Sequence, residues 1–164
     1  MERYQRLIGA RVEAWCAALP EGGLYAPMAY LMGLPAKRVR PALTLMACEL
    51  FGGKAEDVLD EALGIELFHN FTLMHDDIMD AAPLRRGLPT VHEKWGTSTA
   101  ILSGDAMLVK AYQLMGKRAD VLRHRRGVRV GNTGTVDEVD HDLRRAIGHH
   151  EVADDENAAV GQLL

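Results

Sequence analysis

Residues 55–80 have the sequence AEDVLDEALGIELFHNFTLMHDDIMD, and this stretch decides the fold. Its large apolar side chains are Leu59, Leu63, Ile65, Leu67, Phe68, Phe71, Leu73, Met74 and Ile78. Their spacing spreads them around most of the circumference of an α-helix. A helix that is apolar on nearly all sides must be surrounded by other elements, so we predict the central helix of an all-α bundle. Pro83 is expected to end it.

Other helices are expected around this one. The apolar spacing predicts an amphipathic helix over residues 1–19, closed by Pro20, and then a connector. A second helix should begin at Pro41 and stop at Gly52-Gly53. A third, again apolar on most faces, is predicted over residues 97–115. Aromatic residues make up only 5% of the chain, and Leu, Ala and Met outnumber them, which also favours helix over sheet.

The composition changes abruptly after Met115. Residues 116–164 contain no Phe, Tyr, Trp or Met, and no apolar spacing is sustained at a helical or strand period. We therefore divide the chain into a helical domain, residues 1–115, and a divergent, loosely ordered tail, residues 116–164. A frameshift or truncation near residue 116 is the hypothesis that this break suggests, and translating the flanking DNA in its other frames would test it.

Length and charge narrow the class of protein. At 164 residues the chain is long enough for one domain with a core. Its net charge of −4 gives no reason to expect binding to nucleic acid or to acidic membranes. Cys16 and Cys48 show no metal-ligand spacing and are expected to be reduced thiols. The first residues carry charge throughout, so no membrane span or signal peptide is predicted, and a cytoplasmic location is expected.

Three aspartates end the central stretch. Asp76 and Asp80 are four residues apart and share one face of the helix, and Asp77 flanks them. Carboxylates are unfavourable at a helix C-terminus, where the macrodipole is already negative. A hard divalent cation would relieve that repulsion, because it prefers oxygen ligands. We predict a Mg²⁺ site formed by these aspartates; a solvated helix end is the alternative.

Basic residues occur on both sides of this helix. Lys37, Arg38 and Arg40 directly precede the helix predicted to begin at Pro41, where free N–H groups attract anions. Arg85 and Arg86 follow the aspartates. Either set alone could belong to a solubilising loop. Together with a magnesium site they predict a cleft that binds diphosphate, because Mg²⁺ held by few carboxylates usually takes its other ligands from phosphates.

Two histidines lie in the central helix. His69 precedes Asp76 by seven residues, or two turns, so it lies on roughly the same face and is assigned to the site. A histidine in an apolar helix is more often a hydrogen-bonded core residue, and His75 is interpreted in that way.

Four motifs carry a resemblance to a known family. They are AKRVRP at 36–41, ELFHNFTLMHDDIMD at 66–80, LRRGLPTVHEKWG at 84–96 and TAILSGDAML at 99–108. In this order and spacing the chain resembles the trans-isoprenyl diphosphate synthase, or polyprenyl synthetase, family over about residues 34–115. The resemblance implies the N-terminal portion of an isoprenoid-synthase-type helical bundle with a deep central cavity, usually a homodimer.

The resemblance also implies an activity and roles for residues. A family member is a prenyltransferase of isoprenoid biosynthesis that condenses an allylic diphosphate with isopentenyl diphosphate. The resemblance implies that Asp76, Asp77 and Asp80 bind Mg²⁺, which contacts the allylic diphosphate, and that Arg85 helps to bind this diphosphate. It also implies that isopentenyl diphosphate is bound by Lys37, Arg40, His69 and Arg86.

Product length can be inferred from the residues just before the aspartates. Phe71 and Thr72 lie about one turn below the metal face, where a bulky side chain would act as a floor for the growing isoprenoid. This pattern resembles that of some geranylgeranyl (C20) synthases, so a C20 product is expected. Phe71 would be a core residue in either case.

The chain departs from the family pattern in two places. Ala36 stands where the family usually has glycine, and no second aspartate-rich motif follows downstream. We therefore expect half of a cleft, and weak or absent turnover by the isolated polypeptide.

A non-catalytic remnant or partner subunit of a prenyl synthase is one alternative function. A metal-dependent phosphohydrolase using the His75-Asp76 pair is another, although no suitably spaced further ligands appear upstream. A terpene cyclase also has an aspartate-rich helix but does not bind isopentenyl diphosphate.

Overall fold

The computed structural model describes the backbone of residues 1–125 and the side chains of residues 1–117. The elements in chain order are α1 (Glu2–Ala17), α2 (Tyr25–Gly33), α3 (Val39–Leu50), the 3-10 turn η1 (Ala55–Val58), α4 (Leu59–Met79), β1 (Leu84–Arg85), β2 (Leu88–Pro89), α5 (Val91–Trp95) and α6 (Thr97–Arg125). The predicted all-α class is confirmed, with one two-stranded antiparallel hairpin, β1–β2, added to it.

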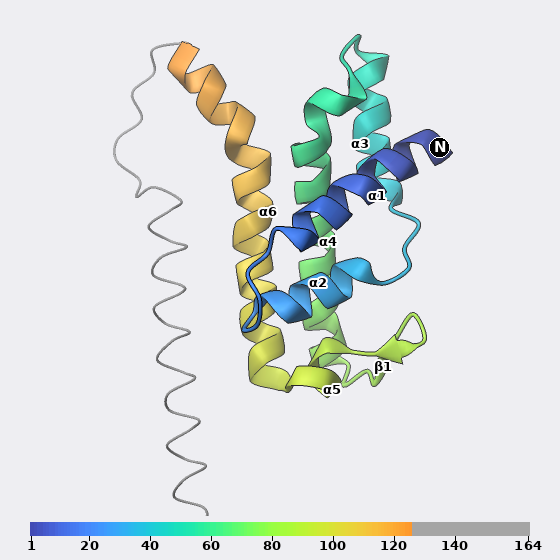
Figure 1. Ribbon diagram of the computed structural model, residues 1–164, viewed down its shortest axis with the longest axis vertical. Helices are drawn as coiled ribbons and strands as arrows, with labels where there is room; N and C mark the ends of the chain where they lie inside the picture. The colour runs from blue at the N-terminus through green and yellow to red at the C-terminus, as the bar shows by residue number, and fades with distance from the viewer. Residues whose placement is uncertain (126–164) are drawn as a thin grey trace, which may run out of the picture. The chain divides into compact units, whose positions relative to one another are not determined.

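Helix α4 occupies the centre of the described chain, as its apolar circumference predicts. It packs most extensively on α6 and also contacts α1, α2, α3 and α5. Figure 1 shows α4 between α3 and α6, with α1 and α2 crossing one side of it. Its buried side chains include Leu63, Leu67 and Met74, so the core follows the length of this helix.

The boundaries of the helices differ from the predicted ones in places. The predicted connector contains the short helix α2, in which Pro27 is tolerated because it lies in the first turn. Residues 55–58 form a 3-10 turn rather than the start of α4. Helix α6 continues to Arg125 rather than ending at Met115. The rest of the predicted tail lies outside the described residues.

Gly52-Gly53 ends α3 as predicted, through a Schellman motif. Gly52 has a φ of +81° and its N–H donates to the Glu49 carbonyl (3.0 Å), while the Gly53 N–H donates to the Cys48 carbonyl (2.9 Å). Glycine suits this position because a side chain would be strained at positive φ.

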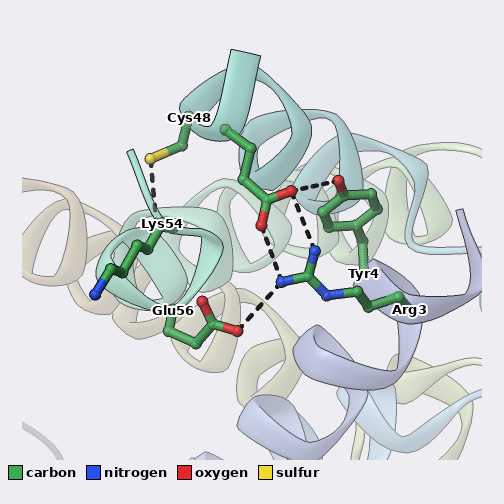
Figure 2. Close-up of polar contacts among 6 residues, drawn as sticks. Arg3, Tyr4, Cys48, Lys54 and Glu56 are labelled. Atoms are coloured by element: carbon green, nitrogen blue, oxygen red, sulfur yellow. Dashed lines mark hydrogen bonds and ion pairs between the residues drawn. The ribbon is translucent and has the colours of Figure 1, made fainter. Parts of the chain in front are cut away.

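Polar contacts on the surface fasten α1 to α3 and η1 (Figure 2). The Arg3 guanidinium lies 2.9 Å from Glu49 Oε1 and 3.4 Å from Glu56 Oε1, and the Tyr4 hydroxyl donates to Glu49 Oε2 at 2.6 Å. The hydrogen bond from Tyr4, followed by that from Arg3, lowers the pKa of the Glu49 carboxyl. These groups are solvated, so the contacts orient α1 more than they stabilise it.

Several large apolar side chains are exposed. Four of them, Val39, Leu43, Met46 and Leu50, follow one face of α3 at helical spacing, and Phe51 next to them is 88% exposed. Within residues 1–125, no helix has an apolar stretch long enough to cross a bilayer.

Gly64 allows α4 and α6 to approach each other closely. A Cβ added there would lie 2.7 Å from Met115 Cγ and 3.0 Å from the backbone oxygen of Ala111. The Met115 side chain can move aside, but the Ala111 carbonyl can do so only if α6 shifts.

We expect Gly64→Ala to lower the free energy of unfolding by about 1–3 kcal/mol, because it forces the two helices apart. Gly9→Ala in α1 is the matched control, since a Cβ there would have no neighbour within 4 Å. That substitution should be neutral or stabilise the helix by up to about 1 kcal/mol. Urea unfolding measures both values, and equal stabilities of the two variants would contradict this account of the α4–α6 contact.

Candidate diphosphate-binding site

The three aspartates at the end of α4 are in different environments. Asp76 and Asp80 are exposed and lie one turn apart, with Asp80 as the C-cap of the helix. Asp77 points into the protein, and its side chain is only 4% exposed. The aspartates predicted to act as one cluster are thus divided into an exposed pair and a buried member.

Asp77 forms an ion pair with Arg85 of the hairpin. Arg85 Nε donates to Asp77 Oδ2 at 2.7 Å, and Nη2 donates to Oδ1 at 2.8 Å. This is the bidentate geometry in which a guanidinium and a carboxylate interact most strongly. Because both Asp77 oxygens accept from Arg85, this contact fixes the direction of the guanidinium group. Asp76 and Asp80 remain the carboxylates more accessible to a metal ion from solvent.

The exposed pair provides an incomplete set of metal ligands. Within the side chains that the structure describes, no three His, Cys, Asp or Glu residues come together as a metal site. Two carboxylates one turn apart do fit Mg²⁺, which is often bound by one or two carboxylates and completes its octahedron with water and substrate phosphate. The donor set therefore fits a metal that arrives with, or is completed by, a phosphate ligand.

The cationic residues predicted for isopentenyl diphosphate line one pocket. Its volume is about 120 Å³. The lining residues are Ala36, Lys37, Arg38, Val39, Arg40, Glu66, His69 and Arg86. Lys37, Arg40, His69 and Arg86 come from three separate segments of the chain, and the fold brings all four together.

Local backbone geometry places the arginines of this pocket. Arg38 is left-handed, with a φ of +48°, and its Nη2 donates to the Met32 carbonyl at 3.0 Å. Arg86 occupies the tight turn of the hairpin with a φ of +54°, followed by Gly87 at +80°. Both arginines hold conformations that are uncommon for side-chain-bearing residues, a feature that clusters at functional sites.

Burial and positive charge shift the protonation equilibria in the pocket. Burial, followed by the charge of Arg40, lowers the pKa of His69. Burial is also the main cause that lowers the pKa of Arg86, which nevertheless stays a cation at neutral pH. Before an anion binds, the pocket therefore contains a neutral imidazole among guanidinium groups.

Glu66 is the pocket residue that the sequence interpretation missed. Its side chain is buried and lies among the cations, where its negative charge opposes the downward pKa shifts of His69 and Arg86. Glu66 is three residues before His69, so both lie on one face of α4. That spacing could have identified it.

Aromatic rings surround the two residues of the predicted floor. Phe71 contacts Phe68 and His75 edge to face, with ring centroids 5.6 Å and 5.0 Å apart. Phe68 in turn lies against Tyr112 of α6. The hydroxyl of Thr72 donates to the His69 carbonyl at 2.7 Å, so this small side chain is bound to its own helix.

His75 faces α6, in keeping with a structural role. Its Nε2 lies 3.4 Å from the Ile101 carbonyl and 3.6 Å from Asp105 Oδ1. A Cβ on Gly104 would lie 2.8 Å from the imidazole, so glycine makes room for the ring. Among the described residues, no third His, Cys, Asp or Glu side chain joins this His-Asp pair in a group that could hold a metal ion.

The comparison with protein families identifies the class. The polyprenyl synthetase family model matches residues 21–137, which extends beyond the 34–115 predicted from the motifs. The chain belongs to the polyprenyl synthetase family.

Its relatives include geranylgeranyl diphosphate synthases. The enzyme of Methanosarcina mazei is 48% identical over 94 residues, which cover 57% of this chain and 29% of that protein. The geranylgeranyl pyrophosphate synthase of Geoglobus acetivorans is 37% identical over 110 residues, covering 67% of this chain and 34% of its own length. The chain thus spans about a third of the length of these relatives.

Solved structures agree with the fold. A geranylgeranyl pyrophosphate synthase superposes with a TM-score of 0.66 at 49% identity, covering 69% of this chain and 35% of that chain. The geranyltranstransferase of Thermotoga maritima gives a TM-score of 0.67 at 30% identity, covering 73% of this chain and 46% of that chain.

The division of the aspartates predicts unequal effects of neutralising them. Asp77→Asn should lower the free energy of unfolding by about 1–3 kcal/mol, because it leaves Arg85 without its charged partner. Asp76→Asn, one residue earlier and exposed, should change it by less than about 0.5 kcal/mol. Chemical denaturation of both variants tests this, and equal losses would show that the ion pair does not hold the hairpin.

A second prediction concerns the protonation of His69. We expect an NMR titration of the free protein to give this imidazole a pKa below its ordinary value of 6.5. Folding then favours the neutral form, so the stabilising contribution is present above about pH 6.5 and is lost as the pH falls toward the folded pKa. Arg40→Met should raise the pKa of His69 by removing a nearby positive charge. A pKa of 6.5 or higher in the wild-type protein would contradict the described pocket.

Proposed function

We propose that this chain carries the two diphosphate subsites of a trans-prenyl diphosphate synthase, an enzyme that joins isopentenyl diphosphate to an allylic diphosphate. The observation that carries the proposal is the pocket in which Lys37, Arg40, His69 and Arg86 meet. His69 shares helix α4 with Asp76, and Arg86 shares the hairpin with Arg85. Cations concentrated in one pocket favour a multiply charged anion, and guanidinium groups suit phosphate oxygens in particular.

The aspartate end of α4 would receive the allylic diphosphate. Asp76 and Asp80 would hold Mg²⁺, and the bidentate contact of Arg85 with Asp77 would keep the guanidinium aimed at the same group. When bound, the metal would neutralise negative charge on the departing diphosphate. The metal role of Asp77 that the family resemblance implies becomes, in this proposal, the orientation of Arg85.

The pocket at the start of α3 would receive isopentenyl diphosphate. Its cations would fix the diphosphate so that the double bond can attack the allylic carbon as the allylic carbon–oxygen bond breaks. The cation so formed would lose a proton, which the departed diphosphate can accept, to give the double bond of the product. The aromatic side chains Phe68 and Phe71 would protect the developing carbocation from water. With Phe71 as the floor, and Thr72 beside it, the product would be the C20 diphosphate, in keeping with relatives named geranylgeranyl diphosphate synthase.

The proposal also includes an oligomeric state and a cellular location. The family resemblance supports a homodimer, and the sequence supports a cytoplasmic protein that needs no nucleic acid. Sedimentation equilibrium of the purified chain would test the first of these, with a monomer at all concentrations as the contradicting result.

Isothermal titration calorimetry tests the two subsites separately. Isopentenyl diphosphate should bind without metal, and binding should weaken at least about tenfold in Arg40→Met through loss of a charge-assisted contact. Geranyl diphosphate should bind only with Mg²⁺, and Asp76→Asn should weaken it without affecting isopentenyl diphosphate. A folded protein that binds neither ligand would contradict the proposal.

A prenyl-transfer assay separates an enzyme from a non-catalytic partner. Labelled isopentenyl diphosphate is supplied with each allylic primer, once with Mg²⁺ and once with a chelator. Metal-dependent product would establish catalysis by this chain. Binding of both ligands without product would instead support the alternative in which the chain is a remnant or partner subunit.

A further inference from the structure

The hairpin β1–β2 carries both arginines that serve the proposed subsites. Arg85 precedes the turn and contacts Asp77, while Arg86 lies in the turn and lines the pocket. The hairpin has only two residues in each strand, so its own ladder cannot fix its position. Besides the ion pair of Arg85 with Asp77, contacts at the base of the hairpin fix its position.

Thr90 closes the base of the hairpin. Its N–H donates to the Pro83 carbonyl at 3.1 Å, and its hydroxyl donates to the Ala82 carbonyl at 2.8 Å. The Ala82 N–H in turn donates to the Asp77 carbonyl at 2.9 Å. A continuous series of hydrogen bonds therefore runs from the aspartate end of α4 to the base of the hairpin.

The hydroxyl of Thr90 does not cap helix α5, although Thr90 is its N-cap residue. Thr90 is the N-cap residue of α5, where a threonine oxygen commonly accepts from a free N–H of the first turn, but it makes no side-chain cap here. Thr90 is only 1% exposed, so its bond to Ala82 is protected from water. Because this buried hydroxyl bonds to Ala82 instead of to its own helix, the role of Thr90 is to hold the two ends of segment 82–90 together.

Tyr30 of α2 makes a second contact with the base of the hairpin. Its hydroxyl donates to the Pro89 carbonyl at 2.7 Å. Its ring meets Trp95 edge to face, with centroids 5.1 Å apart, and Lys94 Nζ lies 4.2 Å from the ring centroid. Figure 1 shows the hairpin next to α5 and below α2, the two helices that these side chains join to it.

We propose that Thr90 and Tyr30 are positioning residues for diphosphate binding, which act through the hairpin to hold Arg85 and Arg86 in place. The proposal rests on the proposed function, because it needs the arginines to bind diphosphate. Neither residue lines the pocket, so neither has to touch the ligand. A small displacement of the hairpin base would move both guanidinium groups, and well-placed hydrogen bonds to phosphate depend on such positions.

Variants of Thr90 separate the hydroxyl from the volume of the side chain. Thr90→Val keeps the shape and removes the hydrogen bond to Ala82, whereas Thr90→Ser keeps the hydroxyl. Calorimetry with inorganic pyrophosphate should give an affinity reduced about three- to tenfold for Thr90→Val and restored to within about twofold of wild type for Thr90→Ser. Tyr30→Phe should also weaken binding while keeping the ring contacts.

Tyr4→Phe is the matched control for Tyr30→Phe. It too removes one phenolic hydrogen bond, of 2.6 Å to Glu49, but far along the chain from the hairpin. Its pyrophosphate affinity should equal that of wild type. The thermal midpoint is measured for all variants, so that affinity is compared only among proteins that are folded at the titration temperature. If Thr90→Val does not fold, Tyr30→Phe carries the test.

The outcomes distinguish this inference from the proposed function. Reduced affinity in Thr90→Val and Tyr30→Phe, with rescue by Thr90→Ser, supports the positioning role. Wild-type affinity in folded Thr90→Val and Tyr30→Phe would overturn it while leaving the diphosphate pocket intact. A folded wild-type protein that does not bind pyrophosphate would overturn the proposed function and the positioning role with it.

Discussion

Helix α4 must bury apolar side chains on most of its circumference, and this requirement places every other helix of the described chain. It contacts α1, α2, α3, α5 and α6. The same helix carries His69 in the cationic pocket and ends in exposed carboxylates. Because α4 is held on several sides, it can keep groups at its C-terminus that its own dipole disfavours. The packing of one helix therefore supports both proposed subsites.

Charge compensation organises the site around that helix. Asp77 and Arg85 neutralise each other at close range, so the hairpin is attached to α4 by a strong directional contact. In the pocket, Glu66 offsets part of the charge of the neighbouring cations. Asp76, Asp80 and the pocket cations carry the charge that a metal and a diphosphate would neutralise. In the proposed function Arg85 has two roles, because it attaches the hairpin to Asp77 and is directed at the allylic diphosphate.

Patterns along single helices were predictable, and contacts between segments were not. The apolar circumference of residues 55–80 and the glycine stop after α3 gave the central helix and a boundary. Helix α2 was missed because it is short and apolar on all sides, which leaves no periodic signal. The burial of Asp77 depends on Arg85, and a sequence motif does not reveal which carboxylate a distant guanidinium will bind. The basic residues and the carboxylates predicted a diphosphate cleft, but the set of Lys37, Arg40, His69 and Arg86 as one subsite came from the family resemblance.

The central claim is that the pocket at the start of α3 binds the diphosphate of isopentenyl diphosphate. The most direct measurement is a crystal structure of this chain with that ligand. The account predicts phosphate oxygens within hydrogen-bonding distance of Lys37, Arg40, His69 and Arg86, with Asp77 and Arg85 still paired. A ligand bound elsewhere, with the pocket cations unengaged at saturating concentration, would contradict it.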